Sequence, residues 1–134
     1  MFSDVEGKEW FLSEVRSAGN TVVMDRQKLE ADSMGGFFTI SFQGGNAANE
    51  RQVNGVAAPN RYGGPYTLGS DKTLGIGLLR STMMAAFKEP DGLNENGYFA
   101  YLSKVTRWDL REGKLEIYSS DSNGAEAILV FTRK

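Results

Sequence analysis

The chain has 134 residues, a formal net charge of −2 and a sequence pI near 5.2, and this length fits one domain that buries a core without cross-links. It contains neither cysteine nor histidine, which excludes a disulfide framework and a thiolate metal site and removes the commonest general base. The mildly acidic balance and the scattered basic residues argue against nucleic acid as a partner. We therefore expect a single domain over residues 1–134, ordered from about 7 to 133, with no cofactor.

The first half of the chain predicts short β-strands, because apolar residues alternate with polar ones between turn sequences. These strands cover residues 8–15, 21–24, 37–42 and 46–55. Trp10 and Leu12 share one face of the first strand, and Phe38, Ile40 and Phe42 share one face of the third. The polar segment between the second and third strands can hold a short helical turn. The fourth strand is almost wholly polar, so we expect it to be exposed or at a sheet edge.

A further strand, after a turn at 69–72, has one apolar face and one bare face. Leu74, Ile76 and Leu78 alternate with Gly75 and Gly77. A face without side chains lets another element lie close against it, and the simplest occupant is a helix from later in the chain. A ligand channel between that helix and the sheet is the alternative, because barrel mouths are frequent small-molecule sites.

That later helix is predicted by apolar residues at three-residue spacing. Phe99, Leu102 and Val105 lie on one side of a segment from about 94 to 105. Three strands with hairpin turns between them then end the chain, over residues 106–110, 114–118 and 126–131. Eight or nine short strands with a single helix, at these spacings, are typical of β-barrels and sandwiches.

Several short motifs occur in a definite order along the chain. They are Trp-x-Leu at 10–12, a glycine, asparagine and tyrosine motif at 55–66, Thr-x-Met-Ala at 82–85, Glu-x-x-x-Phe-x-x-Leu at 95–102 and Leu-x-Ile at 115–117. Each motif is weak alone, but the ordered set covers most of the chain. It resembles the META domain family, also called HslJ-like, of bacterial envelope proteins and some protozoan proteins.

The resemblance implies a mainly β fold, an antiparallel half-barrel or cracked β-barrel with a single helix packed across it. It supplies no catalytic residue, because the family has none to carry over. Where many members have two cysteines, this chain has Pro59 and Ala86, so a redox role borrowed from the family is excluded. Family members are often secreted or lipid-anchored, and some are linked to heat shock. The resemblance therefore implies an envelope protein or lipoprotein with a role in stress.

The stretch from Asn60 to Tyr66 is the main candidate for a binding site. Arg61, Tyr62 and Tyr66 are side-chain types that protein interfaces favour, so a recognition loop is one interpretation. The other is an architectural corner, in which the two intervening glycines supply positive φ and the tyrosines cover the barrel rim. We favour the corner, because turns built from glycine and aromatic residues are usually architectural.

Thr82 and Met84 form a second candidate site. They end the strand that follows the glycine-rich stretch, and methionine adapts to irregular apolar ligands. Ordinary core packing at a strand end is the simpler interpretation, and we favour it.

Together with what the resemblance implies about the cell envelope, these observations predict a non-enzymatic envelope domain that binds another protein or an envelope component, as a monomer. The alternative is a carrier of a lipid or other small apolar ligand between helix and half-barrel. An enzyme is disfavoured because the absence of cysteine and histidine removes the commonest thiol nucleophile, general base and metal ligand. No apolar run is long enough to span a bilayer. A leader is not evident at the N-terminus. The resemblance implies a periplasmic or lipid-anchored location, and a cytoplasmic one is the alternative.

Overall fold

The computed structural model describes residues 2–17, 20–32, 35–44, 51–58, 60–82 and 93–133. Three positions singled out in the sequence lie outside the described residues, namely Pro59, Met84 and Ala86. The elements in chain order are η1 (Phe2–Asp4), β1 (Glu9–Ser17), β2 (Asn20–Val23), α1 (Arg26–Ala31), β3 (Thr39–Gln43), β4 (Gln52–Val56), β5 (Arg61–Leu68), β6 (Leu74–Ile76), β7 (Arg80–Ser81), α2 (Glu95–Leu102), β8 (Arg107–Arg111), β9 (Lys114–Ser120) and β10 (Glu126–Thr132).

The described strands curve into a nearly closed antiparallel barrel with the order β6-β5-β4-β3-β1-β10-β9-β8. The two end strands of this order meet, because Leu74 N donates to Thr106 O at 3.0 Å and Trp108 N donates to Lys72 O at 3.0 Å. β2 pairs with β1, and β7 pairs with β5, outside the main path. The predicted cracked barrel is therefore confirmed.

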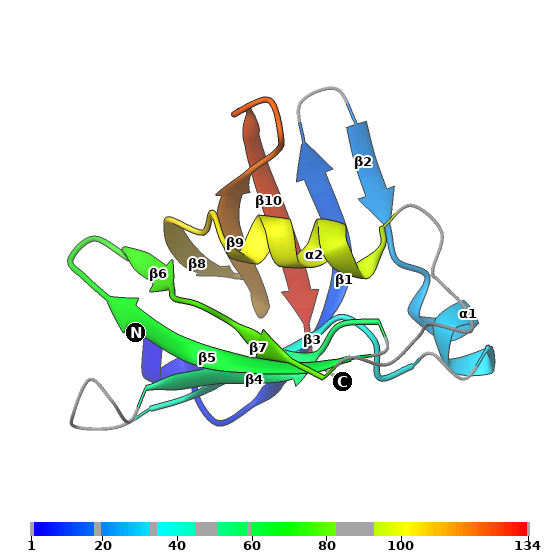
Figure 1. The fold of residues 1–134 in the computed structure, drawn as a ribbon, viewed down its shortest axis with the longest axis horizontal. Coiled ribbons are helices and arrows are strands. Elements are labelled where there is room, and N and C mark those ends of the chain that lie inside the picture. Colours follow the sequence, from blue (N-terminus) through cyan, green and yellow to red (C-terminus); the bar gives the residue numbers. More distant parts are fainter. Residues whose placement is uncertain are drawn as a thin grey trace.

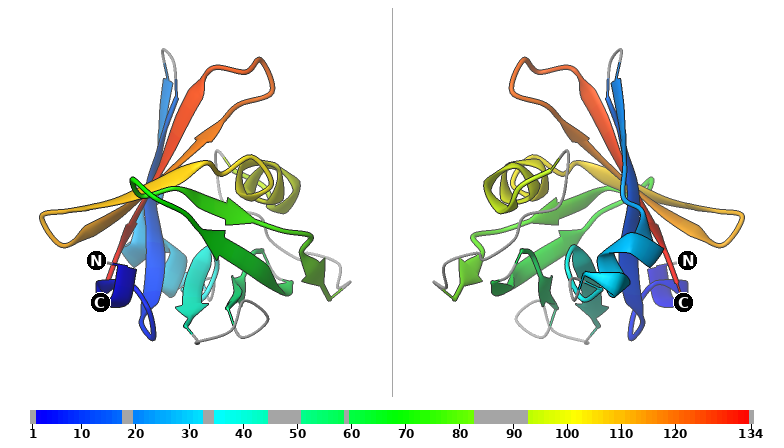
Figure 2. Two further views of the ribbon diagram at one scale, coloured as in Figure 1. Left: turned by 90° about the vertical axis from the view of Figure 1, so that its left-hand side faces the viewer. Right: turned by 90° about the vertical axis from the view of Figure 1, so that its right-hand side faces the viewer.

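Helix α2 crosses the opening of the barrel, in front of β1, β9 and β10 (Figure 1). Figure 2 views this helix along its axis and places it between the β9–β10 hairpin on one side and the strands β5 and β6 on the other. The Asn94 side chain caps its first turn by accepting a hydrogen bond from Gly97 N at 2.7 Å. The single helix expected across the barrel is present at the predicted place.

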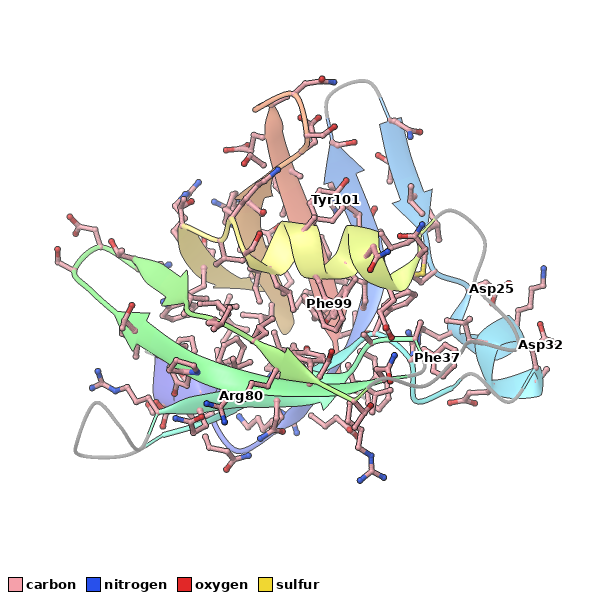
Figure 3. All side chains as sticks on the ribbon, in the orientation of Figure 1. Asp25, Asp32, Phe37, Arg80, Phe99 and Tyr101 are labelled. Atoms are coloured by element: carbon pink, nitrogen blue, oxygen red, sulfur yellow. The ribbon has the colours of Figure 1, made fainter. Side chains whose placement is uncertain are left out.

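The side of the helical segment that faces the core differs from the prediction at one position, since Leu102 and Val105 are buried as expected but Phe99 is not fully buried. Tyr98 and Leu102, four residues apart, are fully buried, whereas Phe99 is only partly buried. Figure 3 shows Phe99 extending from α2 toward β5 and β7, with Tyr101 on the opposite side of the helix. The helix has only eight residues, so one pair at i and i+4 defines its buried face, and a three-residue spacing selects the wrong aromatic residue.

The core extends from the alternating residues of β3 to the N-terminal turn. Phe42 is fully buried, as its alternation predicts. The ring of Phe2 packs edge-on against Phe42 at 5.2 Å and against Trp108 at 4.9 Å, which closes one end of the barrel. Trp10 is buried beside this cluster, and its indole N–H donates to Val5 O at 3.1 Å.

Strand β4 is internal, so the expectation of an exposed or edge strand is wrong. Val53 pairs with Phe42 of β3 on one side and with Gly64 of β5 on the other. Only Val53 points into the core, while Gln52 and Asn54 point outward and give the strand its polar sequence. Residues 45–50 of the predicted strand lie outside the described residues.

Gly75 and Gly77 lie against β5, so the expectation that a helix packs on them is also wrong. A Cβ at Gly75 would meet the hydroxyl oxygen of Thr67 at 2.9 Å, and one at Gly77 would meet Pro65 Cγ at 2.9 Å. Leu78, expected to continue the apolar face of β6, is 86% exposed because the strand has already ended. Neither helix among the described residues has the length and apolar character needed to cross a membrane.

Candidate functional site

Glu95, at the start of α2, binds the turn between β4 and β5. Its Oε2 accepts hydrogen bonds from Ala58 N at 2.8 Å and Asn60 N at 2.9 Å, and its Oε1 accepts one from Asn60 Nδ2 at 2.6 Å. Thr82 Oγ1 donates to Asn60 Oδ1 at 2.8 Å and accepts from Arg61 N at 3.1 Å. We call Glu95, Asn60 and Thr82 the Glu95 clasp, because together they hold the turn, the helix and the end of β7 in one arrangement.

Tyr62 and Tyr98 meet inside the barrel. Their hydroxyl oxygens lie 2.8 Å apart and lie 2.7 and 3.2 Å from the carbonyl oxygen of Thr39. Burial raises the pKa of Tyr62 and of Tyr98 above the usual tyrosine value. Tyr66 is buried as well, with its hydroxyl donating to Gln43 O at 3.1 Å. These phenols are neutral groups that connect strands and helix across the core.

The predicted stretch from Asn60 to Tyr66 is therefore mostly a strand of the barrel. The corner interpretation is wrong, because Arg61–Leu68 form β5, the intervening glycines do not have positive φ, and both tyrosines lie in the core instead of at the rim. The structure brings Asn60 and Thr82 together in the clasp, and among the predicted residues that it describes, only Arg61 has an exposed side chain free of the clasp and core. A binding role for these residues stays a prediction, and Met84 lies outside the described residues.

A groove crosses the outer face of β4, β5 and β7, and its floor is made by glycine. Asn54, Gly63 and Arg80 lie side by side on three neighbouring strands. Tyr62 points into the core, so its neighbour Gly63 points outward, where it leaves a gap between the other two side chains. This glycine groove has a volume of about 720 Å³ and is lined by Gln52, Val53, Asn54, Gly63, Gly64, Pro65, Leu78 and Arg80.

The described residues that line the glycine groove combine one cation, two amide side chains and apolar surface. Arg80 and Asn54 are exposed, and Leu78 is 86% exposed. Figure 3 shows Arg80 on β7, on the side of β5 away from α2. Within the part of the chain that the structure describes, Arg80 makes no ion pair, and no carboxylate lines the groove.

Sequence reasoning missed the glycine groove because its residues are distant along the chain. Asn54 and Arg80 become neighbours only through the pairing of each strand with β5. One local signal was present: a strand containing adjacent glycines has a bare outer position, and such positions mark close approach of another backbone or of a ligand.

A cluster of charges on β8 and β9 is satisfied by its own members. Asp109 and Glu116 face each other across the two strands. Hydrogen bonds from Lys72 and Arg111 hold the pKa of Asp109 well below its usual range, and Tyr118 donates to Glu116 at 2.9 Å. Among the described residues, no group of three or more acidic residues is arranged to hold a metal ion. We therefore interpret this cluster as structural.

The amino-acid sequence matches one known protein family along almost its whole length. The sequence profile of the META domain matches residues 3–134. The chain belongs to the META domain family. This membership confirms the resemblance inferred from the ordered motifs, and the barrel crossed by one helix is the fold of this META domain.

Two solved structures share this fold. One is the NMR structure of a protein from Burkholderia xenovorans, with a TM-score of 0.68 and 25% identity over 98% of this chain and 85% of that one. The other is the crystal structure of a DUF4847 family protein from Bacteroides vulgatus, with a TM-score of 0.59 and 13% identity over 99% of this chain and 96% of that one. At 13% identity the second likeness concerns the fold alone. No curated protein matches the chain in sequence.

Proposed function

We propose that this META domain is a non-catalytic binding module that holds another protein in the glycine groove. The observation that carries the proposal is the bare outer position at Gly63, which lies between the polar side chain of Asn54 and the exposed Arg80. Exposed side chains on either side of a gap in a sheet give a partner both a place to enter and groups to contact.

The remaining polar groups support binding rather than catalysis. The carboxylate of Glu95 accepts hydrogen bonds from the main chain and from Asn60, and Asp109 is held between two cations. Each is engaged in structural contacts that would have to break before it could transfer a proton. The buried tyrosines have raised pKa values, which makes them poor bases near neutral pH.

The alternative function, a carrier of an apolar ligand beneath α2, draws less support from the described residues. Tyr98, Leu102 and Phe38 are fully buried there, and the rings of Phe38 and Tyr98 lie 5.1 Å apart. A ligand in this position would have to displace core side chains. For the location, we propose the cell envelope, on the basis of the family resemblance.

The test is a site-specific photo-crosslink in the cells that make the protein. Benzoylphenylalanine replaces Leu78 beside the groove, and in a control it replaces the exposed Glu126 on β10. We expect a discrete protein adduct from position 78 and none of the same mass from position 126. Fractionation of the same cells should place that adduct with the periplasmic or membrane proteins.

A second variant makes the result specific for the groove. Gly63→Val fills the floor, and a Cβ at this position has room, since its nearest atoms are Val53 O at 3.4 Å and Asn54 Cβ at 3.6 Å. This change should abolish the adduct without unfolding the domain. An adduct that persists in the Gly63→Val background, or that forms equally from both positions, would contradict the proposal.

A further inference from the structure

The lining of the glycine groove has a chemistry that selects among polypeptide partners. We infer that its occupant is an extended segment of the partner in which an acidic side chain, bound by Arg80, lies next to an aliphatic one that contacts Leu78. This inference rests on the proposed function and adds to it the class of sequence that the groove recognises.

Charge complementarity gives the first argument. The whole chain has a formal net charge of −2, yet the described residues that line the groove include one arginine and no carboxylate. Arg80 is exposed and unpaired by any described acidic residue. Its planar guanidinium presents donors in a fork that matches the two oxygens of a carboxylate. A partner carboxylate is therefore the group that this position lacks.

The shape and remaining lining give the second argument. Gly63 leaves the floor without a side chain, so a main chain can lie close to β5. The Asn54 amide can both donate to and accept from a peptide group. Pro65 and Leu78 supply apolar surface at the same groove, and an exposed leucine loses unfavourable contact with water when an aliphatic side chain covers it.

Other anionic partners fit this lining less well. A phosphate group is usually held by several cations or by a row of main-chain N–H groups at a helix N-terminus, whereas Arg80 is the single cation among the lining residues that the structure describes. None of the described lining residues is aromatic, so they offer no flat surface on which sugar rings and nucleic acid bases stack. An acidic polypeptide segment satisfies the arginine, the amide and the leucine together.

The test uses a display library of random decapeptides selected on four proteins. These are the unchanged domain, Arg80→Gln, Arg80→Glu and Gly63→Val. We expect the unchanged domain to enrich peptides with Asp or Glu beside Leu, Ile or Val. Arg80→Gln should lose the acidic preference, Arg80→Glu should shift it to Lys or Arg, and Gly63→Val should enrich none of these peptides. The two Arg80 changes are at an exposed position, so each variant should remain folded.

One enriched peptide and its twin, in which Gln replaces the acidic residue, then give the size of the effect. We expect the unchanged domain to bind the acidic peptide about tenfold more tightly than the twin, and Arg80→Gln to bind both with the same affinity. Equal binding of the two peptides by the unchanged domain would overturn the inference.

The outcomes separate this inference from the proposed function. Peptides that need an open Gly63 but show no acidic preference would overturn the inference and leave protein binding in the groove intact. Polygalacturonate, an acidic polysaccharide, serves as a further probe. If polygalacturonate binds in a way that depends on Arg80, and the library enriches no peptide, then the choice of a polypeptide as the occupant is overturned. If Gly63→Val changes the binding of none of these probes, both the inference and the proposed function are overturned.

Discussion

Glu95→Gln should lower the free energy of unfolding of this domain by about 2 kcal/mol, and Asn60→Asp in the same chain should restore most of it. The glutamine keeps an oxygen for Ala58 N and Asn60 N, but its amide replaces the Oε1 atom that accepts from Asn60 Nδ2. Two amide donors then face each other. Turning the Asn60 amide over would make Nδ2 donate to Thr82 Oγ1, which already accepts from Arg61 N, and the Thr82 hydroxyl would lose its own acceptor.

The magnitude follows from the hydrogen bonds that change. A hydrogen bond to a charged group contributes about 1.5–3 kcal/mol to stability, and a neutral acceptor about half as much. The hydrogen bond from Asn60 Nδ2 is lost, and those from Ala58 N and Asn60 N are weakened because their acceptor is no longer charged. Since Glu95 is partly exposed, hydrogen bonds to water recover part of this loss. Asn60→Asp alone brings a second carboxylate to Glu95 and should cost about 2 kcal/mol or more. In the double variant, the amide introduced at position 95 donates to the new carboxylate at position 60, whose second oxygen accepts from Thr82.

Urea unfolding followed by tryptophan fluorescence at neutral pH measures all four proteins of this cycle. We expect a favourable coupling energy of about 3 kcal/mol between the two changes. Glu126→Gln, on an exposed position of β10, is the matched control and should change stability by less than about 0.5 kcal/mol. Additive effects of the two changes would refute the geometry assigned to the Glu95 clasp.

Three further predictions follow from the same packing and electrostatics. Gly55→Ala should lower the free energy of unfolding in urea by about 3 kcal/mol, because a Cβ there overlaps the Thr39 carbonyl oxygen. Gly63→Ala should change the same free energy by less than about 0.5 kcal/mol. Equal effects of the two changes would contradict the assigned backbone positions. The pKa of Asp109 is lowered in the fold, so the contribution of its carboxylate to stability is complete above about pH 4 and is lost as pH falls through the folded pKa. The difference in unfolding free energy between the unchanged domain and Asp109→Asn should therefore shrink in acid. A difference that stays constant with pH would count against the ion pairs. Burial raises the pKa of Tyr66 to about 12, so its neutral form stabilises the fold below about pH 10, and that contribution is lost as pH rises through the folded pKa. Ultraviolet titration should show phenols that resist ionisation until the domain unfolds. Complete ionisation near pH 10 in the folded protein would exclude this burial.

The prediction that failed most informatively concerns the adjacent glycines of β5. Glycine beside tyrosine and proline favours a turn when only local sequence is considered. In the fold, Gly63 has neighbours on both sides, Asn54 on β4 and Arg80 on β7, and pairing with two strands holds it extended. Tertiary pairing therefore overrides the local preference, and the same pairing makes the groove that we propose as the binding site.

The sequence by itself determined the features that depend on neighbouring residues. Alternation placed Ile40 and Phe42 of β3 in the core. Gly113, which has positive φ in the fold, lies in the hairpin turn predicted between β8 and β9, and the predicted helix begins near Asn94. The ordered motifs also identified the family. A period of two along a strand says which residues share a face, and local caps and turns say where elements begin and end.

Only the tertiary structure decided which faces and strands meet. Tyr98, and not Phe99, is the fully buried aromatic residue here because α2 has a definite rotation over the barrel. Asn54 and Arg80 share the groove because of two strand registers. Register is set by the packing of the whole barrel, through contacts between residues far apart in the chain. A repeating local pattern is compatible with several registers, so it contains no information on which distant residue will lie opposite.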